Sequence, residues 1–275
     1  MREKILNTQL AKGQIALFYL GQVGFLIKYE NTYVMIDGYL SDYVDRHCCS
    51  EQVQWVRKYP APISAEELDF VDFVLCTHTH FDHADPDTLS VLAKVNHKAK
   101  YIVSAANVET ISAYGIKKSD ILGLKADVKA DLGAGLAVTA LPAAHEELHT
   151  DSEGNYLEVG FRLELGDTVL FHAGDGCPYP GLTQRLAGAD VLLLPINGRD
   201  YYRTVVCDII GCFDSREAVL LAKEVGAKLL IPTHFDLYDV NGVNPAHFVD
   251  TLKTLKPGQG FHIFAPGERY LFAKD

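Results

Sequence analysis

The chain begins with short apolar segments that are separated by turn sequences. Residues 15–20, 25–29 and 33–36 are rich in β-branched and aromatic side chains, with Gly-Gln-Val-Gly and Glu-Asn-Thr between them. Such runs, bounded by turn residues, are typical of antiparallel β-strands. A further apolar run, residues 73–76, leads directly into a histidine-rich segment. We therefore expect an antiparallel meander, followed by a buried strand that ends at the histidines.

Helix signals follow these strands and recur in the second half of the chain. Asp85 offers an N-cap before a proline at the first helical position, which predicts a helix toward residue 95. Asp214 and Glu217 resemble a capping box, at the start of a helix that ends at Gly226. The other expected elements are helices from residues 106 and 245 and strands at residues 101–104, 136–141, 156–165, 168–172, 191–194, 228–231, 260–264 and 270–273.

Strands outnumber helices in both halves, and helices recur between them. Two sheets packed face to face, with helices outside, satisfy this pattern. The sequence contains no internal repeat and no Pro/Gly/Ser-rich linker, so we expect one domain over residues 1–275. Residues 38–62 show little periodicity and contain the only tryptophan, Trp55. We expect a long loop there that shapes or covers a site.

Composition and charge narrow the class of protein. No run of about 18 apolar residues exists, and residues 1–14 lack the apolar core of a secretory signal, so we expect a cytoplasmic protein. Free thiols are expected at all six cysteines, because cytosolic proteins rarely keep disulfides. The net charge of −11 argues against nucleic acid as a partner and favours a small-molecule substrate.

Three histidines and an aspartate lie within six positions directly after residues 73–76. In an extended segment His78, His80 and Asp82 point to the same side, so the two imidazoles can bind one metal ion. The neighbouring side chains of Asp82 and His83 diverge and can serve a second ion close to the first. Imidazole and carboxylate together suit zinc, manganese or iron.

Three later segments repeat this placement of a potential ligand directly after an apolar strand. They end at His145, Asp175 and His234. The recurrence predicts a site that is assembled at one edge of the two sheets. His149 is an alternative to His145, and we expect His172 to make a structural or supporting hydrogen bond at a strand end.

The order of these motifs resembles that of the metallo-β-lactamase superfamily: H-x-H-x-D-H, a downstream histidine, Gly-Asp and a late histidine. The segments that begin at Tyr19, Ile36, Thr77, Pro142, Ala173 and Leu194 are similar to the L-ascorbate-6-phosphate lactonase-like branch. The resemblance implies an α/β fold, a four-layer αββα sandwich with metal ions at one edge of the two sheets. It is also compatible with a homo-oligomer.

The resemblance further implies two divalent metal ions, zinc or manganese, with iron as another candidate. The implied ligands form two groups that share a carboxylate. One group is His78, His80 and His145, the other is Asp82, His83 and His234, and the bridging residue is Asp175. Asp37 matches a position that orients a ligand by hydrogen bonding.

These residues predict a metal-dependent hydrolase in which a metal-bound hydroxide attacks a lactone or ester of a small substrate, with or without a phosphate group. We expect the loss of His78 or Asp175 to abolish turnover, and we expect Asp82 to help move protons. A phosphodiesterase or nuclease of the same superfamily is the alternative. A non-catalytic metal-binding protein is a further alternative.

Residues 197–203 follow an apolar strand and are rich in hydrogen-bond donors. Arg199 or Arg203 could hold a carboxylate or phosphate through a bidentate contact. Asn197 and Tyr202 are further candidates for substrate contact. The alternative interpretation is a solvated loop with surface arginines.

Overall fold

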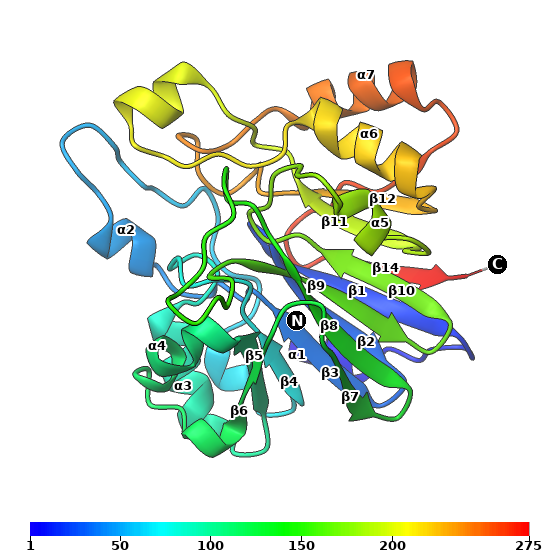
Figure 1. Cartoon of the computed structure of the whole chain (residues 1–275). Coiled ribbons are helices and arrows are strands. Elements are labelled where there is room, and N and C mark those ends of the chain that lie inside the picture. The colour runs from blue at the N-terminus through cyan, green and yellow to red at the C-terminus, as the bar shows by residue number, and fades with distance from the viewer. Residues whose placement is uncertain (275) are drawn as a thin grey trace.

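The computed structural model describes residues 1–274, and in this part of the chain two sheets of seven strands face each other (Figure 1). The first sheet has the spatial order β14 (Arg269–Ala273), β1 (Gln14–Gly21), β2 (Gly24–Tyr29), β3 (Thr32–Ile36), β4 (Phe73–Leu75), β5 (Lys100–Ser104) and β6 (Ile121–Leu124). The second has the order β13 (Gly260–Phe261), β12 (Leu229–Thr233), β11 (Val191–Pro195), β10 (Thr168–His172), β9 (Val159–Leu165), β8 (Leu136–Pro142) and β7 (Lys129–Gly133).

Helices cover the outer faces of both sheets, as predicted from the sequence. The α-helices are α1 (Arg2–Leu6), α2 (Tyr43–His47), α3 (Pro86–Val95), α4 (Val108–Ser112), α5 (Leu182–Arg185), α6 (Ser215–Val225) and α7 (Pro245–Leu255). Short 3-10 turns are η1 (Ala65–Glu67), η2 (Ala105–Asn107) and η3 (Lys118–Asp120), and η4 (Tyr202–Val206) is a π-helical turn. In Figure 1, α6 and α7 lie together beside β11 and β12, whereas α3 and α4 lie beside β4 to β6. The predicted αββα sandwich is confirmed.

Strand β1 shows why the central strands are apolar on both faces. Leu17 and its alternate neighbours pack in the core between the sheets, whereas Phe18 and its alternate neighbours pack under the helices of the first sheet. Successive side chains of a strand point to opposite faces, so a strand buried on both sides cannot alternate with polar residues. A third apolar cluster joins α6 and α7 to the second sheet.

The sequence predicted the meander of β1 to β3, helices α3, α6 and α7, and most strands of the second sheet. It missed β6 and β7, because strands of 4 and 5 residues that are only partly buried offer too few positions for a clear period. The predicted strand at 156–165 begins later, at Val159, and the one at 260–264 is reduced to Gly260–Phe261. All six cysteines are free, as predicted.

The expected long loop at residues 38–62 contains helix α2 and is held in place by buried polar contacts. The hydroxyl groups of Tyr39 and Tyr238 lie 2.8 Å apart, and Tyr238 donates to Asp45 over 2.7 Å. The Trp55 ring packs edge-on against Tyr238, with ring centroids 5.2 Å apart. These contacts fix the segment against the loop after β12. Within residues 1–274, no helix has the length and apolar character that a membrane span requires.

Candidate metal centre

The turns that follow strands β4, β8, β10 and β12 lie at one edge of the sandwich. Strands β10, β11 and β12 are parallel, and β8 runs in the same direction because it is antiparallel to β9, which is antiparallel to β10. In the first sheet β3 and β4 are also parallel, and the backbone of Val159 donates to Thr77 across the two sheets over 3.0 Å. Ligands at the carboxyl ends of such strands therefore meet, although they lie far apart in the sequence.

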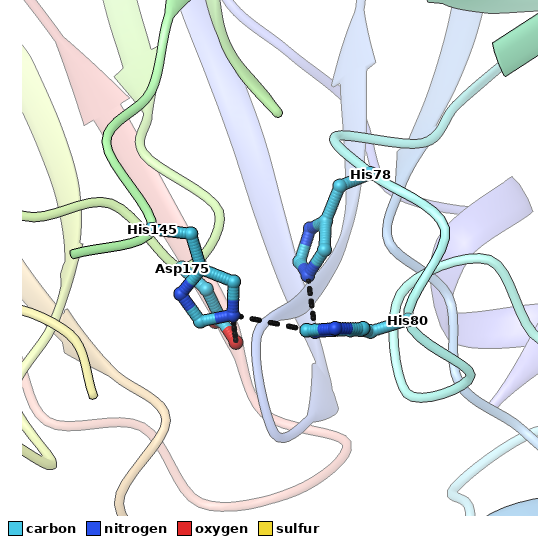
Figure 2. A group of neighbouring side chains, drawn as sticks. All are labelled: His78, His80, His145 and Asp175. Atoms are coloured by element: carbon cyan, nitrogen blue, oxygen red, sulfur yellow. Dashed lines mark hydrogen bonds and ion pairs between the residues drawn. The ribbon is translucent and has the colours of Figure 1, made fainter. Parts of the chain in front are cut away.

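Four of the predicted ligands form a first group at this edge (Figure 2). The Nε2 atom of His78 lies 2.9 Å from Nδ1 of His80, and Nε2 of His145 lies 3.3 Å from the same Nδ1 atom. The Oδ2 atom of Asp175 lies 3.9 Å from Nε2 of His145. Three imidazoles and one carboxylate thus point at a common centre, which is a ligand set that suits a transition-metal cation.

The second group consists of Asp82, His83 and His234, and Asp175 faces it as well. The Oδ1 atom of Asp175 lies 3.1 Å from Nε2 of His83 and 3.4 Å from Nε2 of His234. The Asp82 carboxylate lies 3.6 Å from Nε2 of His234. The two oxygens of Asp175 therefore face different groups, which is the arrangement that a bridging carboxylate needs.

Two backbone features bring Asp175 and His234 to this position. Gly174 has a φ of 56°, and a Cβ atom there would lie 2.6 Å from the Thr77 hydroxyl, so only glycine lets the two turns approach this closely. His234 itself has a φ of 57°, and its backbone N–H donates to the carbonyl of Gln22 over 2.8 Å. Strained backbone of this kind is found at functional sites more often than elsewhere.

Asp37 supports the cluster from behind, as the sequence analysis expected. Its Oδ2 atom lies 2.8 Å from Nδ1 of His83 and accepts from the Thr77 hydroxyl over 2.7 Å. Its Oδ1 atom accepts from the Thr77 backbone over 2.8 Å. Since Nδ1 of His83 is held by Asp37, Nε2 is directed at Asp175, and a supporting carboxylate of this kind also raises the basicity of the imidazole.

Burial and charge divide the histidines into two kinds. Burial lowers the pKa of His78 and lowers that of His145 to about 4, so both imidazoles are neutral and offer lone pairs. Burial acts in the same direction on His83 and His234, but the carboxylates outweigh it. Asp175, Asp82 and Asp37 raise the pKa of His83, and Asp175 raises the pKa of His234 to about 9.

The two carboxylates show the complementary effect. Burial opposes ionisation of Asp175 and Asp82, yet the neighbouring imidazoles hold both pKa values below the ordinary range. Nε2 of His83 and Oδ1 of Asp175 are nevertheless buried without a hydrogen-bond partner. Buried polar atoms almost always have a partner. The unsatisfied atoms, together with the anionic character of the group, fit divalent cations between these side chains.

The sequence analysis missed Gln22, which lies in the turn between β1 and β2. Its side-chain amide donates to Oδ2 of Asp82 over 3.0 Å and lies 3.2 Å from Nε2 of His234. Its backbone has a φ of 59°, which a non-glycine residue adopts rarely. The Gly-Gln-Val-Gly sequence predicted only a turn, because nothing in it revealed that the turn would reach the second group.

Other candidates of the sequence analysis lie elsewhere. His149 is about half exposed and pairs with Glu158 over 3.4 Å, so the structure brings His145 and not His149 into the cluster. His172 is buried at the end of β10, lies 2.8 Å through Nε2 from the Val23 carbonyl, and accepts from Gly174 through Nδ1. The supporting hydrogen bonds expected of His172 are therefore present.

A cavity of about 330 Å³ opens beside the cluster. Its lining consists of Val44, Cys48, Trp55, Thr79, His80, Phe81, Asp82, His145, Asp175, Asp208, Ile209, Ile210 and Asn241. Residues 44–55 supply one wall, so the loop at residues 38–62 shapes the site. The other wall comes from the segment after η4.

The structure does not place the predicted substrate residues in this lining. The Arg199 guanidinium binds the Cys212 carbonyl, the Cys177 sulfur and Glu217, and Arg203 pairs with Asp200. Tyr202 is exposed on the π-helical turn. The two arginines are held by these partners, which the local sequence does not reveal. Their contact with a substrate stays a prediction that this arrangement does not favour.

Asn197 does not line the cavity but contacts a residue that does. It is buried, and its side-chain amide donates over 3.0 Å to Asn241, which does line the cavity. Asn197 is therefore one residue removed from the cavity. Its role as a direct substrate contact also stays a prediction.

Two facing mixed sheets with outer helices, and a cluster of imidazoles and carboxylates at one edge, define a protein of the metallo-β-lactamase fold. The family described as beta-lactamase superfamily domain matches residues 32–235, and the chain belongs to this superfamily.

Similar proteins agree with this assignment. A protein of Caldivirga maquilingensis named UPF0173 metal-dependent hydrolase is 27% identical over 216 residues, which cover 78% of this chain and 86% of that protein. A protein of Archaeoglobus fulgidus with the same name is 29% identical over 228 residues, covering 78% and 87%. The structure of an isothiocyanate hydrolase from Delia radicum gut bacteria has the same fold, with a TM-score of 0.75, 18% identity and coverage of 94% and 100%. The comparisons place the chain among the metal-dependent hydrolases of the superfamily.

Proposed function

We propose that this protein hydrolyses a lactone or ester of a small molecule with two divalent metal ions, zinc or manganese. The observation that carries the proposal is the Asp175 carboxylate, which directs one oxygen to each of two histidine groups at the floor of a cavity. A shared carboxylate between two ligand groups is what a two-metal site requires. The cavity volume lies at the lower end of the range for ligand pockets, which supports a small substrate.

The ligand assignment follows the two groups. His78, His80 and His145 would hold one ion, Asp82, His83 and His234 the other, and Asp175 would lie between them. When bound, the ions would lower the pKa of a water molecule so that hydroxide is available near neutral pH, and would stabilise negative charge on the substrate oxygen.

The residues around the two groups have separate tasks. Asp82 lines the cavity and receives a hydrogen bond from Gln22, so its carboxylate is held in place to accept a proton from the attacking water. Asp37 keeps His83 in the orientation that faces Asp175. His80 is the exposed ligand of the first group, so the substrate reaches the cluster from its side.

Elemental analysis of protein purified without chelators, combined with hydrolysis assays, tests the proposal. We expect bound zinc or manganese, turnover of p-nitrophenyl acetate or a simple lactone, loss of turnover on chelation, and recovery when the metal is restored. Turnover of bis-p-nitrophenyl phosphate alone would make the protein a phosphodiesterase. Bound metal without turnover of esters, lactones or phosphodiesters would make it a metal-binding protein.

The histidine pair in the loop after β8 offers an internal control. His145→Ala removes a ligand of the first group, so we expect loss of bound metal and a decrease in turnover of at least about 100-fold. His149→Ala changes an exposed imidazole four residues away and should leave metal content and turnover within about twofold of the unchanged protein. Metal analysis and steady-state kinetics of both variants measure the difference. Equal effects of the two substitutions would contradict the ligand assignment.

A further inference from the structure

The cavity beside the cluster has a polar floor and apolar walls. His80, Asp82, His145 and Asp175 form the floor, and they belong to the proposed metal ligands. Trp55, Phe81, Ile209, Ile210 and Val44 form most of the walls. A substrate whose reacting bond lies at the floor must therefore place the rest of its structure against apolar side chains.

Two of these wall side chains are unusually open to solvent. Phe81 is 37% exposed and Ile210 is 42% exposed, although both are large and apolar. Both line the cavity together with the apolar side chains of Trp55 and Ile209. Exposed apolar surface that is gathered around a cavity marks a ligand-binding site, because an apolar ligand group removes it from water.

The walls also lack the cations that would hold an anionic substrate. Among the lining residues in the described part of the chain none is lysine or arginine, and Asp208 adds a carboxylate. Arg203 pairs with Asp200, the Arg57 guanidinium donates to the carbonyls of Ser41 and Tyr39, and neither arginine belongs to the lining. A charged group that leaves water without a partner loses much of its hydration energy.

We propose that the part of the substrate remote from the reacting bond is uncharged and apolar, such as an alkyl or aryl group, and carries no phosphate or carboxylate. The proposal rests on the proposed hydrolysis of an ester or lactone at the cluster and names the class of substrate for that site. The apolar group lies between the wall of residues 44–55 and the wall of residues 208–210. Asp208 repels an anion at the same place.

A pair of esters that differ only at the far end of the acyl chain tests the substrate class. p-Nitrophenyl valerate ends in a methyl group, and mono-p-nitrophenyl glutarate ends in a carboxylate at the equivalent position. With the metal-loaded protein we expect kcat/KM to be at least about tenfold higher for the valerate. An equal or higher value for the glutarate would overturn the proposal.

Binding of non-hydrolysed amides separates this inference from the proposed reaction. Valeranilide and glutaranilic acid have the same two chain ends, and the fluorescence of Trp55, the only tryptophan, reports occupation of the cavity. We expect valeranilide to bind at least about tenfold more tightly. If valeranilide binds more tightly but neither ester is turned over, ester hydrolysis is refuted. The inference that the cavity binds an apolar group is then still supported. Equal binding, tighter binding of the acid or no binding of valeranilide would refute the inference.

A change of charge at Asp208 tests the contribution of the wall. Asp208→Asn keeps a residue type that tolerates the positive φ of 54° and removes the negative charge, so we expect the preference for the valerate to fall by about threefold. Glu66→Gln removes the same charge at an exposed position outside the cavity lining and should leave the preference unchanged. An unchanged preference in Asp208→Asn, or an equal fall in both variants, would show that Asp208 does not select the substrate.

Discussion

Asp175→Asn is expected to decrease turnover by at least about 10³-fold and to lower the amount of bound metal, while the protein stays folded. The substitution keeps the shape of the side chain but replaces one oxygen of the carboxylate by an NH2 group, which cannot bind a cation. Because the two oxygens face different histidine groups, either orientation of the amide leaves one group without its shared ligand. Steady-state kinetics and elemental analysis of the purified variant measure both effects.

A second aspartate serves as the control for Asp175. Asp167 is exposed in the turn between β9 and β10, so Asp167→Asn makes the same chemical change away from the cluster. We expect it to keep full metal content and turnover. Circular dichroism and thermal unfolding show whether both variants are folded. An Asp175→Asn protein with full turnover and unchanged metal content would remove the bridging carboxylate from the mechanism.

Asp37→Ala should cause the second large effect, a loss of about 3 kcal/mol in the free energy of unfolding, together with weaker metal binding. Asp37 is completely buried and accepts from the backbone and the hydroxyl of Thr77. Alanine would leave these donors and Nδ1 of His83 without a partner, and it tolerates the φ of 46° poorly. Denaturant unfolding measures the stability, and a metal titration measures the affinity.

Two further substitutions make the result for Asp37 interpretable. Asp37→Asn keeps one acceptor oxygen, so we expect a folded protein whose metal affinity is lower by about tenfold. Asp72→Ala removes an aspartate that accepts from the backbone of Tyr33 but is partly exposed and far from the cluster. This substitution should lower the free energy of unfolding by about 1 kcal/mol and leave metal binding intact. Normal stability and affinity in Asp37→Ala would show that Asp37 does not support the centre.

The positions of the proposed ligands could be predicted because each follows an apolar strand that was itself recognisable. The strand before residue 77 and the strands before His145, Asp175 and His234 are all present, and the residues after them meet at one edge. The resemblance to the superfamily supplied the grouping of the ligands, and the geometry agrees with it. His145 could be separated from His149 only in three dimensions, since both lie in the same loop after β8.

The residues that line the cavity could not be predicted in the same way. Arg199 and Arg203 were chosen from a local run of donors, but both are paired within their own surroundings. Ile209 and Ile210, which do line the cavity, lie only a few residues further along an unremarkable stretch of sequence. Gln22 reaches Asp82 from a turn that is 60 positions away in the chain.

The sequence by itself determined most of the elements of this protein and the types of side chain at its candidate metal centre, because strand periodicity, helix caps and residue type are local properties. It therefore predicted a sandwich of two sheets and a metal centre around residues 77–83. Only the tertiary structure decided which side chains surround that centre. The walls of the cavity come from segments more than 150 residues apart, and their contact depends on how the two sheets pack. For this reason the apolar character of the cavity, on which our proposal for the class of substrate rests, became visible only in the folded chain.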